Sequence, residues 1–419
     1  MPDVSFNSLA VVFGVAFLAP LVLGLAPWLR IPSVVLEITL GIVVGPSLLG
    51  WAKVDEPVAI LATVGLAFLL FLTGLELDLD KLRGQLLTVA AIAFVLSLVF
   101  AGIAGYALDG LGLVRNPLLA AVVLTATSVG LVFPVLEGSG RLGSRFGELV
   151  ITGASIGEFA GVILLSLFFT RDSTDAGTRL FLLGVFVAAV GVVAFALTRR
   201  SKSMPISRVL IRLQDTTAQI RVRGALLILG LFIVLAAHLG LEAILGAFVA
   251  GALVSIVDRD WARTHPQFHV KLEAIGYGFL IPVFFVTSGI SFDLNALTAQ
   301  PATLARVPIF LGALLAVRGL PAVMFYRRIV GARSSVAAGL LQATSLPLIV
   351  AATQIGVATG AISKTNAAAF VAAGLISALA FPVLALRLLH AQPEHKPMNA
   401  QESSTARQVA RGDRHGARA

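Results

Sequence analysis

The chain has 419 residues, of which 58% are hydrophobic and only 13% are charged. Soluble domains carry about 25% charged residues, so this composition excludes a water-soluble fold. The chain contains no cysteine, which excludes disulfides, thiolate metal sites and a cysteine nucleophile. Its formal net charge is +9.

Apolar runs of membrane-spanning length recur along the whole chain. A hydrocarbon core about 30 Å thick needs about 20 apolar residues per helix, so we expect an all-α polytopic membrane protein with about thirteen transmembrane helices. In chain order, the expected spans are 8–29, 31–50, 58–77, 86–108, 118–138, 148–170, 179–198, 222–237, 241–257, 275–292, 303–326, 334–356 and 365–389. No Lys or Arg precedes the first run, which we interpret as a retained helix rather than a cleaved signal peptide.

The distribution of basic residues predicts the orientation. With the N-terminus outside, most of the Lys and Arg residues fall in cytoplasmic segments, as the positive-inside rule requires. We interpret the basic segment 199–223 as a topology determinant that faces anionic lipid, rather than as a nucleic-acid site. Segment 391–419 is polar and basic, so we expect a disordered cytoplasmic tail. These features favour a multi-pass protein of the plasma (inner) membrane with a cytoplasmic C-terminus.

Three short motifs recur in the same order in the second half of the chain, about 210 residues further on. The matching segments are 36–44 with 241–249, 74–82 with 289–297, and 126–128 with 343–345. This separation spans an odd number of expected helices, so the two copies cross the membrane in opposite directions. We therefore predict an inverted-topology repeat, with copies at about 8–170 and 222–389 and a connecting helix at 179–198. The alternative is chance similarity between apolar helices.

Polar residues near the centres of four spans predict a site at the middle of the membrane, where polar groups are costly and usually functional. They are Glu158, Arg318, the pair Thr127 and Ser128, and the pair Thr344 and Ser345. Gly130, Pro134 and Pro347 lie close to the two pairs, so we expect both of these helices to be broken there. Freed carbonyls and hydroxyl oxygens suit Na⁺ or K⁺. The alternative for each hydroxyl is a bond back to the preceding helical turn.

Glu158 is the candidate ion- and proton-binding residue. A carboxylate inside the membrane is costly when charged, and binding either a proton or a cation lowers that cost, so one ligand can replace the other. The alternatives are a structural ion pair with Arg318 and a glutamate lining a water-filled vestibule. Ser155 lies one turn earlier on the same helix face, where its hydroxyl either joins the site or only bonds the carboxylate. Glu37, in a Gly-rich helix, is a possible accessory residue for pairing, subunit contact or proton guidance.

Segments 31–50, 71–79 and 125–128 resemble the second monovalent-cation:proton antiporter family, which includes sodium/hydrogen exchangers and potassium-efflux antiporters. The resemblance runs from about residue 30 to 389. It implies two crossed broken helices and a homodimer in which a core domain moves like an elevator against a dimerisation domain. Gly157 stands where the family carries the first residue of an acid pair, and Glu158 keeps the second. Arg318 aligns with the family's lysine and, because it stays protonated, is expected only to balance charge.

The predicted function is therefore exchange of Na⁺ or K⁺ for H⁺ across the lipid bilayer, and electroneutral exchange if Glu158 is the one titrating group. The alternatives are a gated cation efflux pathway without proton coupling, and a proton-coupled transporter of another small solute on the same architecture. We expect no enzymatic activity and no cofactor, because no nucleophile, metal or phosphate motif occurs in the sequence. A second copy of the chain is the expected protein partner.

Overall fold

The computed structural model describes residues 6–26, 31–76, 84–168, 176–200, 219–257, 266–298 and 301–390. Within these ranges the regular structure is helical and contains no strand, which confirms the expected all-α fold. Segment 391–419 and most of segment 199–223, for which we predict a tail and a topology determinant, lie outside the described residues.

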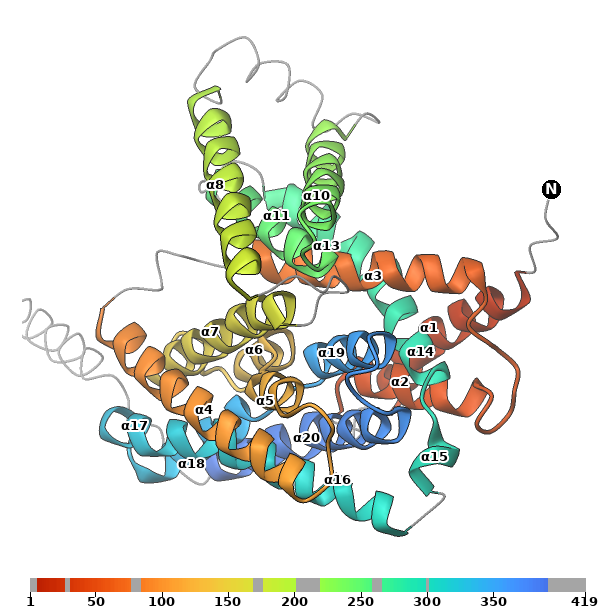
Figure 1. Cartoon of the computed structure of the whole chain (residues 1–419), viewed down its shortest axis with the longest axis vertical. Helices are drawn as coiled ribbons and strands as arrows, with labels where there is room; N and C mark the ends of the chain where they lie inside the picture. The colour runs from red at the N-terminus through yellow and green to blue at the C-terminus, as the bar shows by residue number, and fades with distance from the viewer. Residues whose placement is uncertain are drawn as a thin grey trace, which may run out of the picture.

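The helices follow one another as shown in Figure 1. Those of the first half are α1 (Asn7–Leu25), α2 (Ser33–Val44), α3 (Glu56–Leu75), α4 (Gln85–Gly110), α5 (Pro117–Thr125), α6 (Val129–Gly138), α7 (Arg145–Phe168) and α8 (Ala176–Arg200). Those of the second half begin with α10 (Ile220–His238), α11 (Ala243–Val257), α13 (Pro266–Ile275), the π-helix η1 (Gly276–Leu280) and α14 (Ile281–Ile290). They continue with α15 (Leu294–Thr298), α16 (Pro301–Leu314), the π-helix η2 (Leu315–Gly319), α17 (Leu320–Val330), α18 (Ala332–Gln342), α19 (Pro347–Ala358) and α20 (Lys364–His390).

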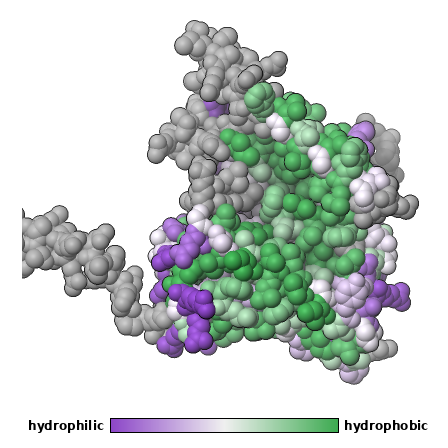
Figure 2. Space-filling model, turned by 60° about the vertical axis from the view of Figure 1, so that its left-hand side comes forward, coloured by the Kyte–Doolittle hydropathy of each residue, from purple (hydrophilic) through white to green (hydrophobic). Residues whose placement is uncertain are grey.

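In the described part of the chain, ten helical stretches are long and apolar enough to cross a membrane. Three further apolar helices are shorter, at Ser33–Val44, Leu180–Val193 and Ala243–Ile256. Together these stretches overlap the thirteen spans expected from the sequence, with different ends at several of them. Figure 2 shows a broad hydrophobic surface with hydrophilic residues gathered at two opposite edges, which is the pattern of a multi-pass membrane protein.

The expected boundary that differs most from the structure is the start of one span in the second half of the chain. The span expected at 275–292 begins at Pro266, because α13, η1 and α14 form one continuous helical stretch. Lys271 and Glu273 interrupt the apolar run in the sequence, and hydropathy therefore hides a helical start that the backbone continues through. Charged residues at a helix end are ordinary where the end reaches the membrane surface.

The helix contacts of one half recur in the other half, which supports the predicted inverted repeat. The repeat relates α2 to α11 and α14 to α3. α2 packs on α14, and α11 packs on α3 correspondingly. In the first half, α4 contacts α5 and α7. In the second half, α17 contacts α18 and α16 contacts α20. The contacts divide the helices into a first bundle of α1–α3, α10, α11, α13 and α14, and a second bundle of α4–α7 and α16–α20.

Glycines permit the close approach of α3 and α11 in the first bundle. A Cβ atom added to Gly74 would lie 2.0 Å from the carbonyl oxygen of Phe248 on α11, and one added to Gly251 would lie 1.9 Å from the carbonyl oxygen of Phe71 on α3. Small residues at such crossings let helix backbones pack directly in a membrane, where apolar side chains gain little by leaving lipid. The two contacts are reciprocal, so this helix pair depends on both glycines.

We expect Gly251→Ala to lower the free energy of unfolding by about 1–3 kcal/mol, because its methyl group would force α3 and α11 apart. The measurement is the thermal unfolding midpoint of the purified protein in detergent. Gly230→Ala on neighbouring α10 is the matched control, since a Cβ there meets no atom within 4 Å. Equal midpoints for the two variants would contradict the close-packing explanation.

Candidate functional site

Two helices are interrupted where the sequence predicts. α5 ends at Thr125 and α6 begins at Val129, while α18 ends at Gln342 and α19 begins at Pro347. Pro347 takes one of the first positions of α19, where the missing N–H costs no helical hydrogen bond. Both expected broken helices are therefore present. Figure 1 shows α5, α6 and α19 meeting near the centre of the molecule, beside α7.

The two unwound segments are hydrogen-bonded to each other. The amide of Ser128 donates to the carbonyl oxygen of Thr344 at 3.1 Å. The hydroxyl of Thr127 donates to the carbonyl oxygen of Gln342 at 2.6 Å. All four residues are buried, so backbone groups that leave the two helices find their partners inside the protein. The broken helices therefore cross at their interruptions.

Glu158 lies in the middle of α7 and is 4% exposed. Its Oε2 accepts a hydrogen bond of 2.9 Å from the backbone N–H of Val129, the first residue of α6. The carboxylate therefore caps the N-terminus of a half-helix, where free N–H groups carry a partial positive charge. In the described part of the chain no hydrogen bond reaches the other carboxylate oxygen. Sequence spacing does not predict this capping contact, because it joins two different helices.

Arg318 lies in the π-helical turn η2 and is 3% exposed. Its Nε donates to Thr127 Oγ1 at 2.7 Å, and its Nη2 donates to the carbonyl oxygen of Gly153 at 3.0 Å and to Gln342 Oε1 at 2.7 Å. The guanidinium carbon is 5.2 Å from the centre of the Phe94 ring, within reach of a cation–π contact. Among the described residues no ion pair joins Arg318 to an acid, so the pairing with Glu158 that the sequence leaves open is not present.

The space beside Arg318 explains why residue 157 is a glycine. A Cβ atom built on Gly157 would lie 2.5 Å from Arg318 Nη2 and 3.3 Å from Thr127 Oγ1. The guanidinium, held there by its three hydrogen bonds, therefore occupies the space that a Cβ atom at position 157 would need. From the sequence, Gly157 is recognised only as a departure from the acid pair of the family that the chain resembles. The structure adds a steric reason for a glycine at this position.

Gln342 is a site residue that sequence reasoning missed. Its side-chain Nε2 donates to the carbonyl oxygen of Val150 at 2.7 Å, its Oε1 accepts from Arg318, and its backbone carbonyl accepts from Thr127. The side chain is 1% exposed, and it links α7, α18 and η2. The sequence feature that could have identified Gln342 is its position as an amide side chain directly before Ala343-Thr344-Ser345, in an otherwise apolar run.

The remaining candidates differ in what their hydroxyls contact. Thr344 Oγ1 donates back to the carbonyl oxygen of Leu340 at 3.1 Å, which is the alternative that the sequence allows. Ser345 Oγ is buried and has no hydrogen-bond partner in the described residues. Its backbone is held by Ser377 of α20, whose hydroxyl donates to the Ser345 carbonyl oxygen at 3.0 Å and accepts from the Ser345 N–H at 3.3 Å.

Ser155 and Glu37 are not joined to this network. Ser155 is partly buried one turn before Glu158, and the described contacts include no hydrogen bond from its hydroxyl to the carboxylate. Glu37 is buried in α2, in the first bundle, and no described hydrogen bond or ion pair connects it to Glu158 or Arg318. No group of three His, Cys, Asp or Glu side chains suited to a metal ion occurs among the described residues.

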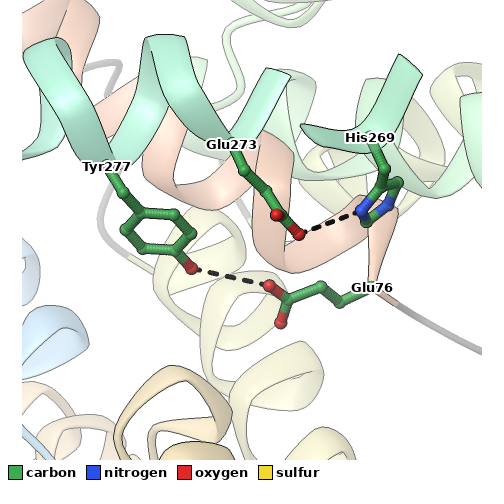
Figure 3. A network of polar contacts seen from close by, with 4 residues as sticks. All are labelled: Glu76, His269, Glu273 and Tyr277. Carbon is green, nitrogen blue, oxygen red and sulfur yellow. Dashed lines mark hydrogen bonds and ion pairs between the residues drawn. The ribbon is translucent and has the colours of Figure 1, made fainter. Parts of the chain in front are cut away.

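A second polar network lies at the end of α3 (Figure 3). Tyr277 Oη donates to Glu76 Oε1 at 3.5 Å, and His269 Nδ1 lies 3.1 Å from Glu273 Oε1. Tyr277 comes from η1, and His269 and Glu273 come from α13. Within the described chain no hydrogen bond connects this network to the residues around Arg318.

Comparisons with known proteins agree with this architecture. A family model described as "Sodium/hydrogen exchanger, transmembrane" matches residues 13–386. The putative Na⁺/H⁺ antiporter YjbQ of Bacillus subtilis is 31% identical, in a match that covers 94% of this chain and 65% of the relative, so the chain spans less than two thirds of that protein. The probable Na⁺/H⁺ antiporter 3 of Methanocaldococcus jannaschii is 28% identical, with 93% of this chain and 98% of the relative covered.

A solved structure shares the fold. The sodium proton antiporter MjNhaP1 from Methanocaldococcus jannaschii superposes with a TM-score of 0.65, covering 91% of this chain and 98% of that one. The sequence identity between the two is 18%. The similarity therefore concerns the arrangement of helices.

We expect Gly157→Ala to destabilise the protein by about 1–3 kcal/mol, because its methyl group would displace the Arg318 guanidinium from three hydrogen bonds. Adding Arg318→Lys should remove much of this extra cost, since lysine lacks the outer nitrogen that meets the methyl group. A double-mutant cycle of thermal unfolding measures the coupling between the two positions. Gly138→Ala, with open space around its Cβ, is the control. Additive effects of the two changes would contradict the shared volume.

Proposed function

Because the chain belongs to the sodium/hydrogen exchanger family, a family of transporters rather than enzymes, we propose that it exchanges Na⁺ for H⁺ at Glu158. The single observation that carries this proposal is a buried carboxylate beside the crossing of two broken helices, with no cationic side chain paired to it in the described structure. Such a carboxylate lowers its cost inside the membrane by taking up either a proton or a cation.

The surroundings of Glu158 favour a small hard cation. One carboxylate oxygen is held by the Val129 N–H, so the side chain is oriented while the other oxygen stays available to a ligand. Ser345 Oγ, buried without a hydrogen-bond partner among the described residues, is a candidate oxygen ligand from the second broken helix. Ser128, Ser155 and Thr344 remain candidate ligands, because a hydroxyl that donates its hydrogen keeps lone pairs for a cation. Thr127 Oγ1 already donates to Gln342 and accepts from Arg318.

We further propose that the second bundle is the moving core and that the first bundle is the dimerisation domain of a homodimer. Both broken helices and Glu158 belong to the second bundle, so an elevator movement of this bundle would carry the site as one unit. The proposed repeat boundaries, about 8–170 and 222–389, divide each bundle between the two halves of the chain. We place the protein in the plasma membrane with its N-terminus outside, on the distribution of basic residues.

We expect Glu158→Gln to abolish exchange while the fold is retained. The amide cannot exchange a proton for a cation, but its side-chain oxygen can still accept the Val129 N–H. The assay is cation-induced proton release from everted membrane vesicles, scanned over Li⁺, Na⁺ and K⁺. Glu148→Gln, an exposed position on the same helix, is the matched control and should keep activity.

Robust exchange by the Glu158→Gln variant would remove Glu158 from the mechanism. Cation flux by the unmodified protein without proton release would instead favour the gated efflux pathway. A response to K⁺ equal to that for Na⁺ would extend the proposal to both ions, and proton release driven only by another solute would replace it.

We also expect exchange to be electroneutral. Gly157 carries no acid and Arg318 stays protonated, so Glu158 is the one buried acid that can titrate among the described residues of the second bundle. Its charge is cancelled by the proton in one half of the transport cycle and by the cation in the other half. A membrane potential, which acts with about 2.3 kcal/mol per charge per 100 mV, should then leave the rate unchanged. The measurement is exchange in proteoliposomes under an imposed potential. A rate that rises with potential would show that a second group titrates.

A further inference from the structure

Two hydrogen bonds join the first and second bundles at one end of their interface. Gln354 Nε2 on α19 donates to Ser288 Oγ on α14 at 3.2 Å. The backbone N–H of Glu242, directly before α11, donates to Ser166 Oγ near the end of α7 at 3.1 Å. In the proposed orientation all four residues lie toward the outside, so we call this the outer end of the interface. The two bundles are therefore tied together at the outer end in this conformation.

Helix packing shows which residues of α3 and α14 correspond under the proposed repeat. A Cβ atom added to Gly41 of α2 would lie 2.3 Å from the carbonyl oxygen of Val286 on α14, and one added to Gly251 of α11 would lie 1.9 Å from that of Phe71 on α3. Val286 and Phe71 are 215 residues apart, which is also the separation at which the second of the three sequence motifs recurs. Packing and sequence therefore align α3 with α14 in the same register.

In this register Thr73 of α3 corresponds to Ser288 of α14. Each hydroxyl donates to the carbonyl oxygen four residues earlier in its own helix, at 3.0 Å for Thr73 and 2.7 Å for Ser288. The Ala-Thr-Ser motif at the two helix breaks recurs after 217 residues, which places Glu137 of α6 where α19 carries Gln354. The counterpart of the pair Gln354 and Ser288 is therefore the pair Glu137 and Thr73.

The counterpart pair lies at the other end of the interface, which we call the inner end, and it is not formed in this structure. Thr73 is near the end of α3, and Glu137 is near the end of α6 with an exposed side chain. Among the described residues no hydrogen bond joins the two side chains, and the described bond of Thr73 stays within α3. Copies of an inverted repeat exchange their contacts when a transporter opens to the opposite side. A contact that the second copy makes now is then made by the first copy after the movement.

We propose that Gln354 and Ser288 form a latch that keeps the outer end closed in this conformation, and that Glu137 and Thr73 form the matching latch at the inner end once the second bundle has moved. This inference rests on the proposed exchange by an elevator movement. In the inner latch the Thr73 hydroxyl donates to the Glu137 carboxylate, a charge-assisted hydrogen bond that replaces its bond within α3. One latch therefore breaks as the other forms.

The absence of cysteine from the sequence makes both latches testable by cross-linking. Ser288→Cys with Gln354→Cys tests the outer latch, and Thr73→Cys with Glu137→Cys tests the inner latch. The protein in proteoliposomes is treated with a short bis-methanethiosulfonate reagent, and cross-links are identified by mass spectrometry. We expect both pairs to cross-link, and each cross-link to stop Na⁺-driven proton movement until a reductant removes it. Thr73→Cys with Gln354→Cys, which takes one residue from each end, is the matched control and should not cross-link.

The two latches should also be coupled in rate. Gln354→Ala removes the bond at the outer end, so cross-linking of Thr73→Cys with Glu137→Cys should become about fivefold faster, as expected for the loss of one hydrogen bond. Thr359→Val, which removes only bonds within α19 near the same end, is the control and should leave this rate unchanged.

Three results would overturn the proposal: an inner pair that does not cross-link, exchange that continues after either cross-link, or an inner cross-linking rate that Gln354→Ala does not change. Should Thr73→Cys fail to fold, Glu137→Cys alone is labelled with a membrane-impermeant maleimide. Gln354→Ala should slow this labelling, because the inner end then closes more often. Equal labelling with and without Gln354→Ala would contradict the latches as well.

A Glu158→Gln arm separates this inference from the function on which it rests, since cross-links are detected in the protein itself and not through the ion carried. Exchange by Glu158→Gln would overturn the proposed ion site. Loss of exchange in Glu158→Gln, together with an inner pair that never cross-links, would overturn the latches alone.

Discussion

The structure depends on how backbone groups are satisfied where two helices unwind inside the membrane. Lipid supplies no hydrogen bonds, so each N–H and C=O that leaves a helix needs a partner from the protein. The crossing provides several of these partners: Ser128 with Thr344, Thr127 with Gln342, and Val129 with Glu158. The residue proposed to bind the ion is thus also part of what holds the first break together. The Glu158 carboxylate therefore has a structural role as well as its proposed role in ion binding.

Electrostatics around the crossing follow from the same constraint. The carboxylate of Glu158 is aimed at a half-helix N-terminus, whose partial charge orients it without neutralising it. The guanidinium of Arg318 is surrounded by oxygen atoms that carry no formal charge. The two opposite charges are therefore each satisfied by their own partners. A direct ion pair would be simpler, but it would leave no carboxylate for a cation.

Sequence alone predicted the spans, the repeat and both helix breaks, because hydropathy and short polar motifs record these features directly. It could not predict Gln342 or the role of Gly157, since both depend on which side chains meet across helices that are far apart in the chain. The Thr-Ser pairs show the same limit: the sequence treats them alike, whereas the structure engages Thr127 and Thr344 and leaves Ser345 Oγ without a partner among the described residues. The charged start of α13 was missed because hydropathy scores polarity rather than helix continuity.

The volume shared by Gly157 and Arg318 also bears on how such a protein can evolve. An acid gained at position 157 would collide with the guanidinium, and an arginine lost first would leave three buried acceptors without their donor. The two positions are therefore coupled, so the effect of a change at one depends on the residue at the other. A side chain introduced at position 157 is therefore accommodated or excluded according to the residue at position 318.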